Sequence, residues 1–556
     1  MKRLRVRTRC PCDLRLKMDR MRDSRMGSLD DRVQKGVRTM NRSRVLLTML
    51  AVILALVPVS SGALAGSSSV LRVAVETNPP TLDPHITTNA ISREIAAHVF
   101  ETLLTYDEDY QVIPQLALKY EASKDHRVYT FYLRSNVKFH NGKTMSAVDV
   151  KASLERIRGV SPSRADFAVI SDIEVVDPLT LRITLREPCG AFPYVLANPV
   201  TFNAVMPAEI ASKDVKEIPV DLLVGTGPFM IDEWVSDVKL VLKRFDDYAV
   251  DKRFQGSGIG GERRVYFDKV EMIPVLETGT RVAGLETGTY DVVEGVPMPA
   301  YDRLKGNTSI QLGTRFVSGV IFEINHKDPL TSNVKVRQAI LAALNAEEIL
   351  AAVTNGHREF YRVQPSFFIP EQKAWHMRNG EEFYNQNNPE HARALLKEAG
   401  YGGEPVVIIC SRDYDYQYRA GLALEAQLKR AGMNVKVEVM DWPSQMAKAK
   451  SLKDWNINCS GWTLRPDPIG LNGSLMSGSS YAYGYNNPDM EHLLMAGIRA
   501  GTLEERQQIY KQVQELLYTD VPVIRVGDLF APAGWQKSVF GVKPWYIMRY
   551  WNVMRK

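Results

Sequence analysis

The chain has 556 residues, of which 45% are hydrophobic and 24% are charged, and its formal net charge is +6 at pH 7. Of its 70 basic and 64 acidic residues, 15 and 5 lie in residues 1–65, which leaves 55 basic and 59 acidic residues and a net charge of −4 beyond that segment. The composition therefore argues against a basic nucleic-acid-binding protein and against a disordered chain.

The N-terminal segment has the features of an export signal. An apolar run of fourteen residues, 45–58, is followed by Ala63, Leu64 and Ala65, which match the A-x-A cleavage pattern. The run is short for a membrane span, although an uncleaved anchor remains the alternative. We expect residues 1–65 to be a leader, with translation starting at Met40. No lipobox cysteine lies at the cleavage site, so the mature protein is expected to be free in the periplasm.

Three cysteines follow the leader: Cys189, Cys410 and Cys459. They allow one disulfide at most and contain no CxxC, so neither a disulfide scaffold nor a structural zinc site is supported. Cys410 and Cys459 both lie in apolar, strand-like segments. They are either a bonded pair or two buried thiols.

The 491 residues after the leader are enough for about three domains. A short strand is predicted from Val70, then a helix over about 92–104. Strands are predicted at 181–185, after the loop that begins at 224, and at 239–244. A glycine-rich loop at 255–264 is followed by strand-like sequence instead of a helix, which excludes a nucleotide fingerprint and favours a flexible surface loop.

The segment 129–157 contains the clearest local signals. Alternating apolar residues predict one strand at 129–133 and a second at 137–139, and Asn141 with Gly142 predicts a sharp turn. Ser146 and Asp149 have the spacing of a helix-start box. His140, beside the turn, is interpreted as a hydrogen-bonded structural residue.

Helices and strands alternate in the second half, which predicts mixed α/β lobes. The predicted helices are 278–285, 333–344, 345–353, one that opens at 388–390, 418–431 and one that opens at Thr502; the predicted strands are 291–293, 406–411 and 435–441.

No catalytic pattern is found in the sequence. HExxH, GxSxG and P-loop motifs are absent, and the nine histidines show no ligand spacing. We therefore predict no catalytic residues, no metal site and no cofactor.

The segment 456–472 is the strongest candidate for a binding function. It carries Trp462 and then Arg465, Pro466, Asp467 and Pro468, where two prolines fix the backbone around one carboxylate. Such a carboxylate suits a ligand cation. A surface Asp in a proline-rich turn is an equally good interpretation.

Several motifs follow one another along the chain: TLDPH at 81–85, YTFYLRSNVKFHNG at 129–142, GTGPF at 225–229, VRQAI at 336–340, PDP at 466–468, and YNNPDMEHLL at 485–494 with ERQQIY at 505–510. In this order they resemble the family 5 extracytoplasmic solute-binding proteins of ATP-binding-cassette importers, which include dipeptide-, oligopeptide-, glutathione- and nickel-binding proteins.

The resemblance implies an α/β fold of two lobes joined by hinge strands, with a third domain inserted into the first lobe. It places domain I at 66–108, 214–318 and 524–556, domain II at 109–213, and domain III at 319–523. The segment 129–157 then belongs to domain II, away from the cleft.

The resemblance also implies ligand contacts. Asp467 matches an Asp that pairs with the ligand's α-ammonium group in peptide-binding relatives, a contact that is favourable on closure only when both charges are present. Trp462 and Thr463 are expected to line the same cleft. A loop that touches ligand in dipeptide-binding relatives matches four residues, Thr87, Thr88, Asn89 and Ala90.

Three arginines complete the candidate site. Arg358 and Arg362 lie roughly where relatives offer a cation to a ligand carboxylate. Arg465 departs from the pattern of the peptide-binding relatives. It either selects an extra anion, caps a strand or neutralises Asp467 internally.

We expect a monomeric periplasmic receptor that encloses a peptide or peptide-like solute between two lobes and delivers it to the membrane permease and ATPase subunits of an importer. Nucleic acid is not an expected partner. A nickel or metal-chelate receptor of the same fold is one alternative, and a secreted hydrolase is the other. In either Trp462→Ala or Asp467→Ala we expect weaker binding with little change in melting temperature.

Overall fold

The computed structural model describes residues 69–556, so the predicted leader and the start at Met40 lie outside the described residues. The described chain is a mixed α/β structure built on one 11-stranded sheet. The strand order is β15-β14-β16-β12-β17-β11-β1-β10-β9-β8, with β13 attached to β17. Within residues 69–556 no helix is long and apolar enough to cross a membrane.

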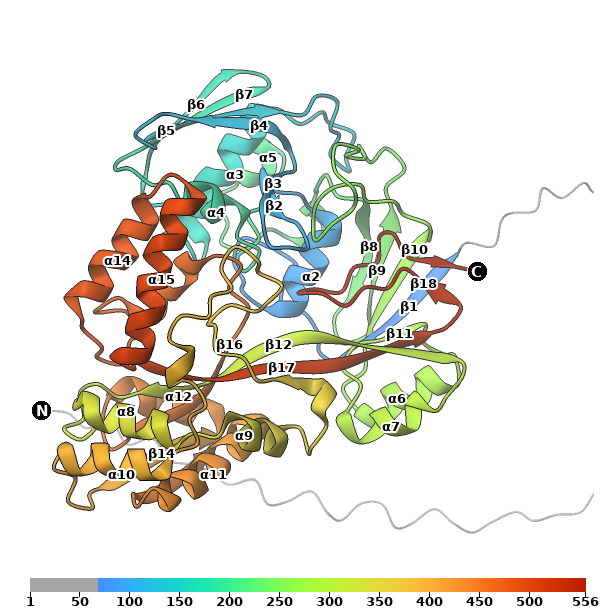
Figure 1. Cartoon of the computed structure of the whole chain (residues 1–556). Coiled ribbons are helices and arrows are strands. Elements are labelled where there is room, and N and C mark those ends of the chain that lie inside the picture. The colour runs from blue at the N-terminus through green and yellow to red at the C-terminus, as the bar shows by residue number, and fades with distance from the viewer. Residues whose placement is uncertain (1–68) are drawn as a thin grey trace, which may run out of the picture. The chain divides into compact units, whose positions relative to one another are not determined.

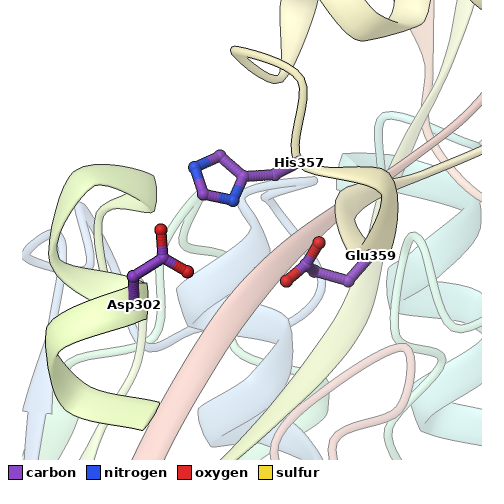
Figure 2. A group of neighbouring side chains, drawn as sticks. All are labelled: Asp302, His357 and Glu359. Carbon is purple, nitrogen blue, oxygen red and sulfur yellow. The ribbon is translucent and has the colours of Figure 1, made fainter. Parts of the chain in front are cut away.

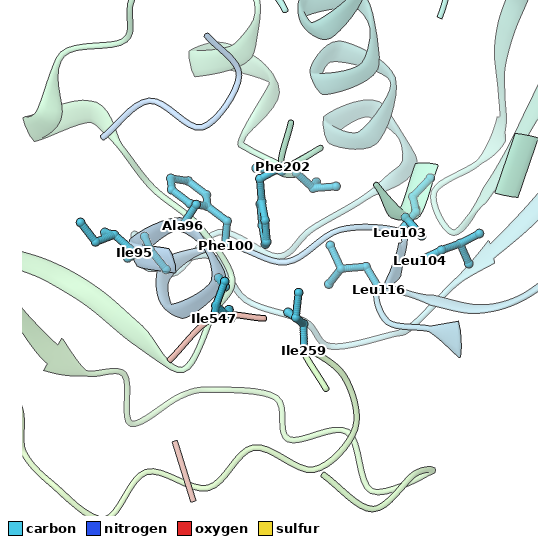
Figure 3. Close-up of a cluster of buried hydrophobic side chains, with 14 of the residues drawn as sticks. Ile95, Ala96, Phe100, Leu103, Leu104, Leu116, Phe202, Ile259 and Ile547 are labelled. Carbon is cyan, nitrogen blue, oxygen red and sulfur yellow. The ribbon is translucent and has the colours of Figure 1, made fainter. Parts of the chain in front are cut away.

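One end of the sheet, with the helices around it, forms what we call the first lobe. Its strands are β1 (Val70–Val75), β8 (Phe229–Val235), β9 (Lys239–Arg244), β10 (Lys269–Pro274) and β11 (Val292–Val293). Its helices are α2 (Ala90–Val99), α6 (Thr278–Glu286) and α7 (Met298–Lys305). Figure 3 shows part of its core, where Ile95 of α2 and Phe100, the residue that follows this helix, lie near Ile547 from the C-terminal segment.

The other end of the sheet forms the second lobe. Its strands are β13 (Tyr361–Arg362), β14 (Pro405–Ser411), β15 (Asn434–Met440) and β16 (Ile457–Trp462). Its helices are α8 (Val334–Ala343), α9 (Ala346–Val353), η2 (Arg358–Phe360), η3 (Glu381–Phe383), α10 (Pro389–Glu398), α11 (Asp415–Arg430), α12 (Trp442–Ser451), η4 (Pro468–Leu471), α13 (Asn472–Leu475), α14 (Pro488–Arg499) and α15 (Leu503–Thr519). The parallel pairs β14–β15 and β14–β16 are joined through helices, as β-α-β units require.

Two long strands connect the lobes. β12 (Ile310–Ile324) and β17 (Val523–Gln536) pair antiparallel along almost their whole length and run side by side through the middle of Figure 1. Register shifts interrupt the pairing between Phe316 and Ser318 and between Val320 and Ile321. The proposed domain boundaries at 318/319 and 523/524 both fall within these strands.

A separate four-stranded sheet packs with the longest helix of the N-terminal half. Its strands are β4 (Ala117–Ala122), β5 (Val128–Leu133), β7 (Thr180–Leu185) and β6 (Ile170–Asp177), and the helix is α3 (Ala147–Val160). The remaining elements are β2 (Leu104–Tyr106), β3 (Val112–Pro114), α4 (Phe192–Ala197), α5 (Ala208–Ala211), η1 (Val220–Leu222), β18 (Val539–Phe540) and β19 (Met554–Arg555).

The segment 129–157 follows its predictions in all but one element. The Asp149 carboxylate accepts the backbone N–H of Ser146 at 2.8 Å, which confirms the helix-start box, and Gly142 has a φ of +85° in the predicted turn. His140 is structural, because its ring contacts the Gly227 carbonyl at 3.0 Å and burial lowers its pKa to about 4. The second predicted strand, 137–139, is wrong. The structure has only an isolated bridge between Lys138 and Thr144 there.

Other elements are shifted, and one loop differs in burial. α2 ends at Val99, five residues before the predicted end, and α11 begins three residues before its predicted start. The surface-loop prediction is right only for the ends of the glycine-rich loop: Gln255 and Arg264 are exposed, whereas Gly258 through Gly261 are buried and Arg263 forms a buried ion pair with Glu101.

All three cysteines of the described chain are buried thiols. Cys410 and Cys459 lie on the neighbouring strands β14 and β16, below Gly421 of α11, where burial raises the pKa of both thiols.

Candidate ligand-binding site

A groove of about 800 Å³ is lined by residues from both lobes. The first lobe contributes Trp535 and Trp545, and the second contributes the turn 370–373. Lys373 Nζ lies 2.8 Å from the Asp109 carboxylate, so an ion pair links the turn 370–373 to the loop between β2 and β3 across this groove. The groove has the size of a small-molecule site and lies where lobe closure can enclose a solute.

The predicted residue Arg362 does not line the groove but contacts Glu371, which does. Its guanidinium donates to both carboxylate oxygens of Glu371, at 2.8 and 3.0 Å, and lies 4.9 Å from the centre of the Phe530 ring. Arg358 lies elsewhere, at the surface, where it contacts the Tyr361 carbonyl and Glu347. The structure therefore places only one of these two arginines beside the groove.

Behind Arg362 lies a buried polar cluster that the sequence analysis did not identify. Asp528 Oδ1 accepts from Arg525 and from Gln364, the latter at 3.1 Å. Asp528 Oδ2 is buried and has no hydrogen-bond partner among residues 69–556; Arg362 Nη1 is 3.9 Å away. Burial raises the pKa of Asp528. Charged residues within the otherwise apolar strand sequence of β17 were the signal for this cluster.

Asp467 is held in a buried ion pair. Arg506 of α15 donates to both oxygens of its carboxylate, at 2.8 and 2.6 Å, and the Ile469 N–H donates to Oδ1 at 2.9 Å. Both side chains are almost fully buried. The Arg506 guanidinium also lies 4.3 Å from the Tyr194 ring and 4.9 Å from the Trp375 ring. The contact of Asp467 with a ligand ammonium group stays a prediction, since both oxygens already have a cationic partner inside the protein.

The sequence contained a signal for Arg506. Tyr510, Val513 and Leu517 follow it at four, seven and eleven residues, so Arg506 lies on the apolar face of α15. A charged residue on a buried face requires a buried partner.

Arg465 does not pair with Asp467. Its guanidinium lies 4.0 Å from the Trp462 ring centre, and Nη2 donates to the Ser474 hydroxyl at 3.0 Å. Nη1 is buried without a partner, and no carboxylate in the described chain lies within ion-pair distance. Internal neutralisation of Asp467 by Arg465, one of the three alternatives, is therefore wrong.

Trp462 is the last residue of β16, and Thr463 follows it. Trp462 is buried, packs against Phe367 at 5.9 Å between ring centres, and leaves its Nε1 without a partner in residues 69–556. Thr463 is exposed. Leu464 belongs to the core cluster of the first lobe and Trp462 to that of the second, so the turn lies where the two lobes meet.

The segment 87–90 forms the start of α2. The Asn89 side chain accepts from Ile91 N at 3.1 Å and from Ser92 N at 3.4 Å, which caps the helix, and the Thr87 hydroxyl accepts the Asn89 N–H. Thr88 and Ala90 are exposed. These residues have local partners, and their contact with a ligand stays a prediction.

A group of metal-ligand type lies at the surface. Asp302 of α7 faces His357 and Glu359 of the turn around η2, and the three ligand atoms lie within 4.8 Å of one another (Figure 2). Asp302 lies 55 positions before His357 in the chain, so the spacing of the residues in the sequence could not reveal the group.

The protein has two lobes on one sheet, with a groove between them. This architecture is that of a protein that binds a solute by enclosing it. The family model for bacterial extracellular solute-binding proteins, family 5 (middle), matches residues 111–482, and the chain belongs to this family.

Individual relatives agree with this assignment. The chain is 28% identical over 505 residues to a probable peptide ABC transporter periplasmic-binding protein of Sinorhizobium fredii, covering 87% of this chain and 93% of the relative. It is 27% identical over 469 residues to the glutathione-binding protein of Salmonella typhimurium, covering 81% and 87%. Among solved structures, the agropinic acid complex of the Agrobacterium protein AgaA has a TM-score of 0.68 and 27% identity, covering 88% and 99%. CtaP of Listeria monocytogenes, at 22% identity and a TM-score of 0.77, shares the fold and covers 88% and 99%.

Proposed function

We propose that the chain is the periplasmic receptor of an ATP-binding-cassette importer and binds a peptide or peptide-like solute between its lobes. The observation that carries the proposal is the groove of about 800 Å³ lined from both lobes and linked by the Lys373–Asp109 ion pair. Curated relatives named for peptide and glutathione binding support the solute class. The permease and ATPase subunits of the importer are the partners that follow from this role, and the receptor acts as a monomer.

The same proposal accounts for the conformational step. β12 and β17 are the connection that allows the lobes to close, and closure removes water from the solute. Beyond Asn458, β16 pairs with β12 and has no strand of the described chain on its other side, and this edge would offer backbone groups to an extended peptide, which gives affinity with modest side-chain selectivity.

The test begins with the solute-free protein, prepared by unfolding and refolding, and a defined pool of di- and tripeptides. Native mass spectrometry should show retained peptides, and each retained peptide should raise the melting temperature, since a ligand that binds only the folded state stabilises it. Release of cleaved peptides would instead support the hydrolase alternative. A pool that leaves both mass and melting temperature unchanged would reject the peptide proposal.

A metal-chelate receptor is the second candidate, favoured by the group Asp302, His357 and Glu359. Because all three residues lie at the surface, we propose that solute binding does not depend on this group. Metal analysis of the purified protein, with Glu359→Gln as the matched variant, separates the two. Solute binding that requires metal and is lost in the variant would favour the metal-chelate receptor.

A further inference from the structure

Arg465 is positioned rigidly at the junction of the lobes. Its backbone carbonyl and that of Pro466 both accept from the Gln372 side chain, at 2.7 and 3.2 Å. Gly470 lies against the aliphatic part of the Arg465 side chain, since a Cβ there would come within 3.2 Å of it. With Trp462 stacked on the guanidinium at 4.0 Å, the orientation of the charged end is fixed before any ligand binds.

The charge of Arg465 has no counter-ion in contact with it. Four buried arginines of the described chain lie against carboxylates: Arg156 with Asp83, Arg263 with Glu101, Arg506 with Asp467 and Arg525 with Asp528. Buried Arg93 instead lies over the Tyr546 ring, without an ion pair to another described residue. Arg465 has one neutral partner, Ser474, and a buried Nη1 without any. Arg465 as a whole is half-buried, but its Nη1 is shielded from water, and a shielded cationic nitrogen is costly unless a further group neutralises it.

Glu323 is the acidic group whose charge acts on Arg465, but it does not serve as the counter-ion of Arg465. Its Oε2 accepts from the Asn458 side chain at 2.8 Å, and the side chains of Tyr483 and Trp462 also lie against its carboxylate, but it forms no ion pair with Arg465. Burial raises the pKa of Glu323 to about 7, so a large share of it is neutral at neutral pH. Burial lowers the pKa of Arg465 to about 10, which leaves the guanidinium charged.

The two open donors of this turn match one kind of ligand group. Arg465 Nη1 is a buried donor without an acceptor within residues 69–556. Trp462 Nε1, on the ring stacked against it, lies beside the Glu323 carboxylate but forms no full hydrogen bond there. A carboxylate supplies the acceptors and the missing negative charge together. We propose that Arg465 and Trp462 form a subsite for a carboxylate group of the bound solute. This inference rests on the proposed function and names the charge of the group that the receptor selects.

The test compares three versions of one pool of di- and tripeptides: with free carboxyl groups, with every carboxyl converted to an amide, and with only the C-terminal carboxyl converted. Wild-type protein should bind the free peptides at least about 10-fold more tightly than the fully amidated ones by calorimetry, because a buried ionic contact is lost. If the wild type still binds the third pool tightly, the carboxylate that it recognises belongs to an acidic side chain of the peptide. If tight binding of the third pool is lost, the recognised carboxylate is the C-terminus.

The variants decide whether Arg465 is responsible. Arg465→Met should bind free and amidated peptides alike, with a melting temperature no lower than that of the solute-free wild type. Arg465→Lys should keep part of the preference. Arg182→Met is the matched control and should behave as wild type. Arg182 is an exposed arginine of β7 that pairs with Glu174 of β6.

Each contrary outcome has a distinct meaning. Equal binding of free and amidated peptides by the wild type, a preference that persists in Arg465→Met, or a large drop in the melting temperature of that variant would overturn the subsite and leave the peptide receptor intact. Failure to bind any pool would reject the proposed function and the subsite with it.

Discussion

Arg465 and Asp467 are separated by a single proline, and the protein treats their charges in opposite ways. Asp467 is neutralised inside the second lobe by the two nitrogens of Arg506. Arg465 points its charge at a tryptophan ring and a hydroxyl and keeps one buried donor unused. The difference indicates that Asp467 holds the turn in place, while Arg465 is the member of the pair with capacity left for a ligand.

The largest expected effect comes from breaking the ion pair between Asp467 and Arg506. Asp467→Ala leaves Arg506 buried and unpaired, which should lower the free energy of unfolding by about 3–5 kcal/mol. Urea unfolding measures this directly. The ion pair changes the sequence-based expectation that the melting temperature would stay nearly constant.

The double variant Asp467→Leu with Arg506→Met is the control, because it removes both charges together and should recover most of the stability. An Asp467→Ala protein as stable as wild type would show that the ion pair is not the main role of this residue.

The second effect tests whether Glu323 is the hidden counter-ion of Arg465. Burial raises the pKa of Glu323 from 4.5 to about 7, so its stabilising protonated form is complete below pH 4.5 and is lost as the pH rises through 7. Glu323→Gln should therefore be more stable than wild type by up to about 3 kcal/mol at pH 8 and equal to it at pH 4. Thermal unfolding across this range gives the answer. A Glu323→Gln protein that is destabilised at pH 8 would mean that Glu323 already neutralises Arg465.

A smaller effect is expected at Asn89, another predicted ligand residue with an internal partner. Asn89→Ala removes the cap of α2 and should cost about 1 kcal/mol of stability. Asn89→Ser, which retains a capping oxygen, is the matched variant and should restore most of it. If peptide affinity falls equally in both variants while stability differs, Asn89 contacts ligand as well as capping the helix.

The smallest effect concerns the ion pair across the groove. Lys373 and Asp109 are both well exposed, so Lys373→Ala should leave the melting temperature almost unchanged. We expect faster release of bound peptide, by a few fold at low salt, and less difference from wild type at high salt because screening weakens the pair. Stopped-flow measurements at two salt concentrations test this, with Lys335→Ala, from the surface pair with Glu398, as control.

Local sequence signals predicted much of the secondary structure because each has a short-range cause. The Ser146–Asp149 box, the Thr502–Glu505 box and the turn at Gly142 depend on residues a few positions apart, and all three are present. The strand predicted at 137–139 failed because its buried residues, Val137 and Phe139, pack into the core without a partner strand. An alternation of apolar and polar residues predicts an extended segment, but it cannot show whether a second strand lies beside that segment and pairs with it.

Pairings between distant residues could not be predicted from the sequence. Asp467 meets Arg506 across 39 positions, and β12 pairs with β17 across about two hundred. The proline-flanked Asp467 was visible as a constrained carboxylate, but the sequence spacing could not show which cation faces it. The same limit applies to Asp528, whose partners come from the same strand and from Gln364 before it.

The pairing of β12 with β17 has a mechanical consequence. Because these strands belong to the same hydrogen-bonded sheet as the strands of both lobes, the connection is a ribbon that resists stretching and sliding and yields mainly to bending and twisting. The bending is easiest at the register shifts near Phe316 and Val320, where ladder hydrogen bonds are missing. We therefore expect the receptor to open by flexing a continuous β-ribbon at these two register shifts, where a protease would find no extended linker.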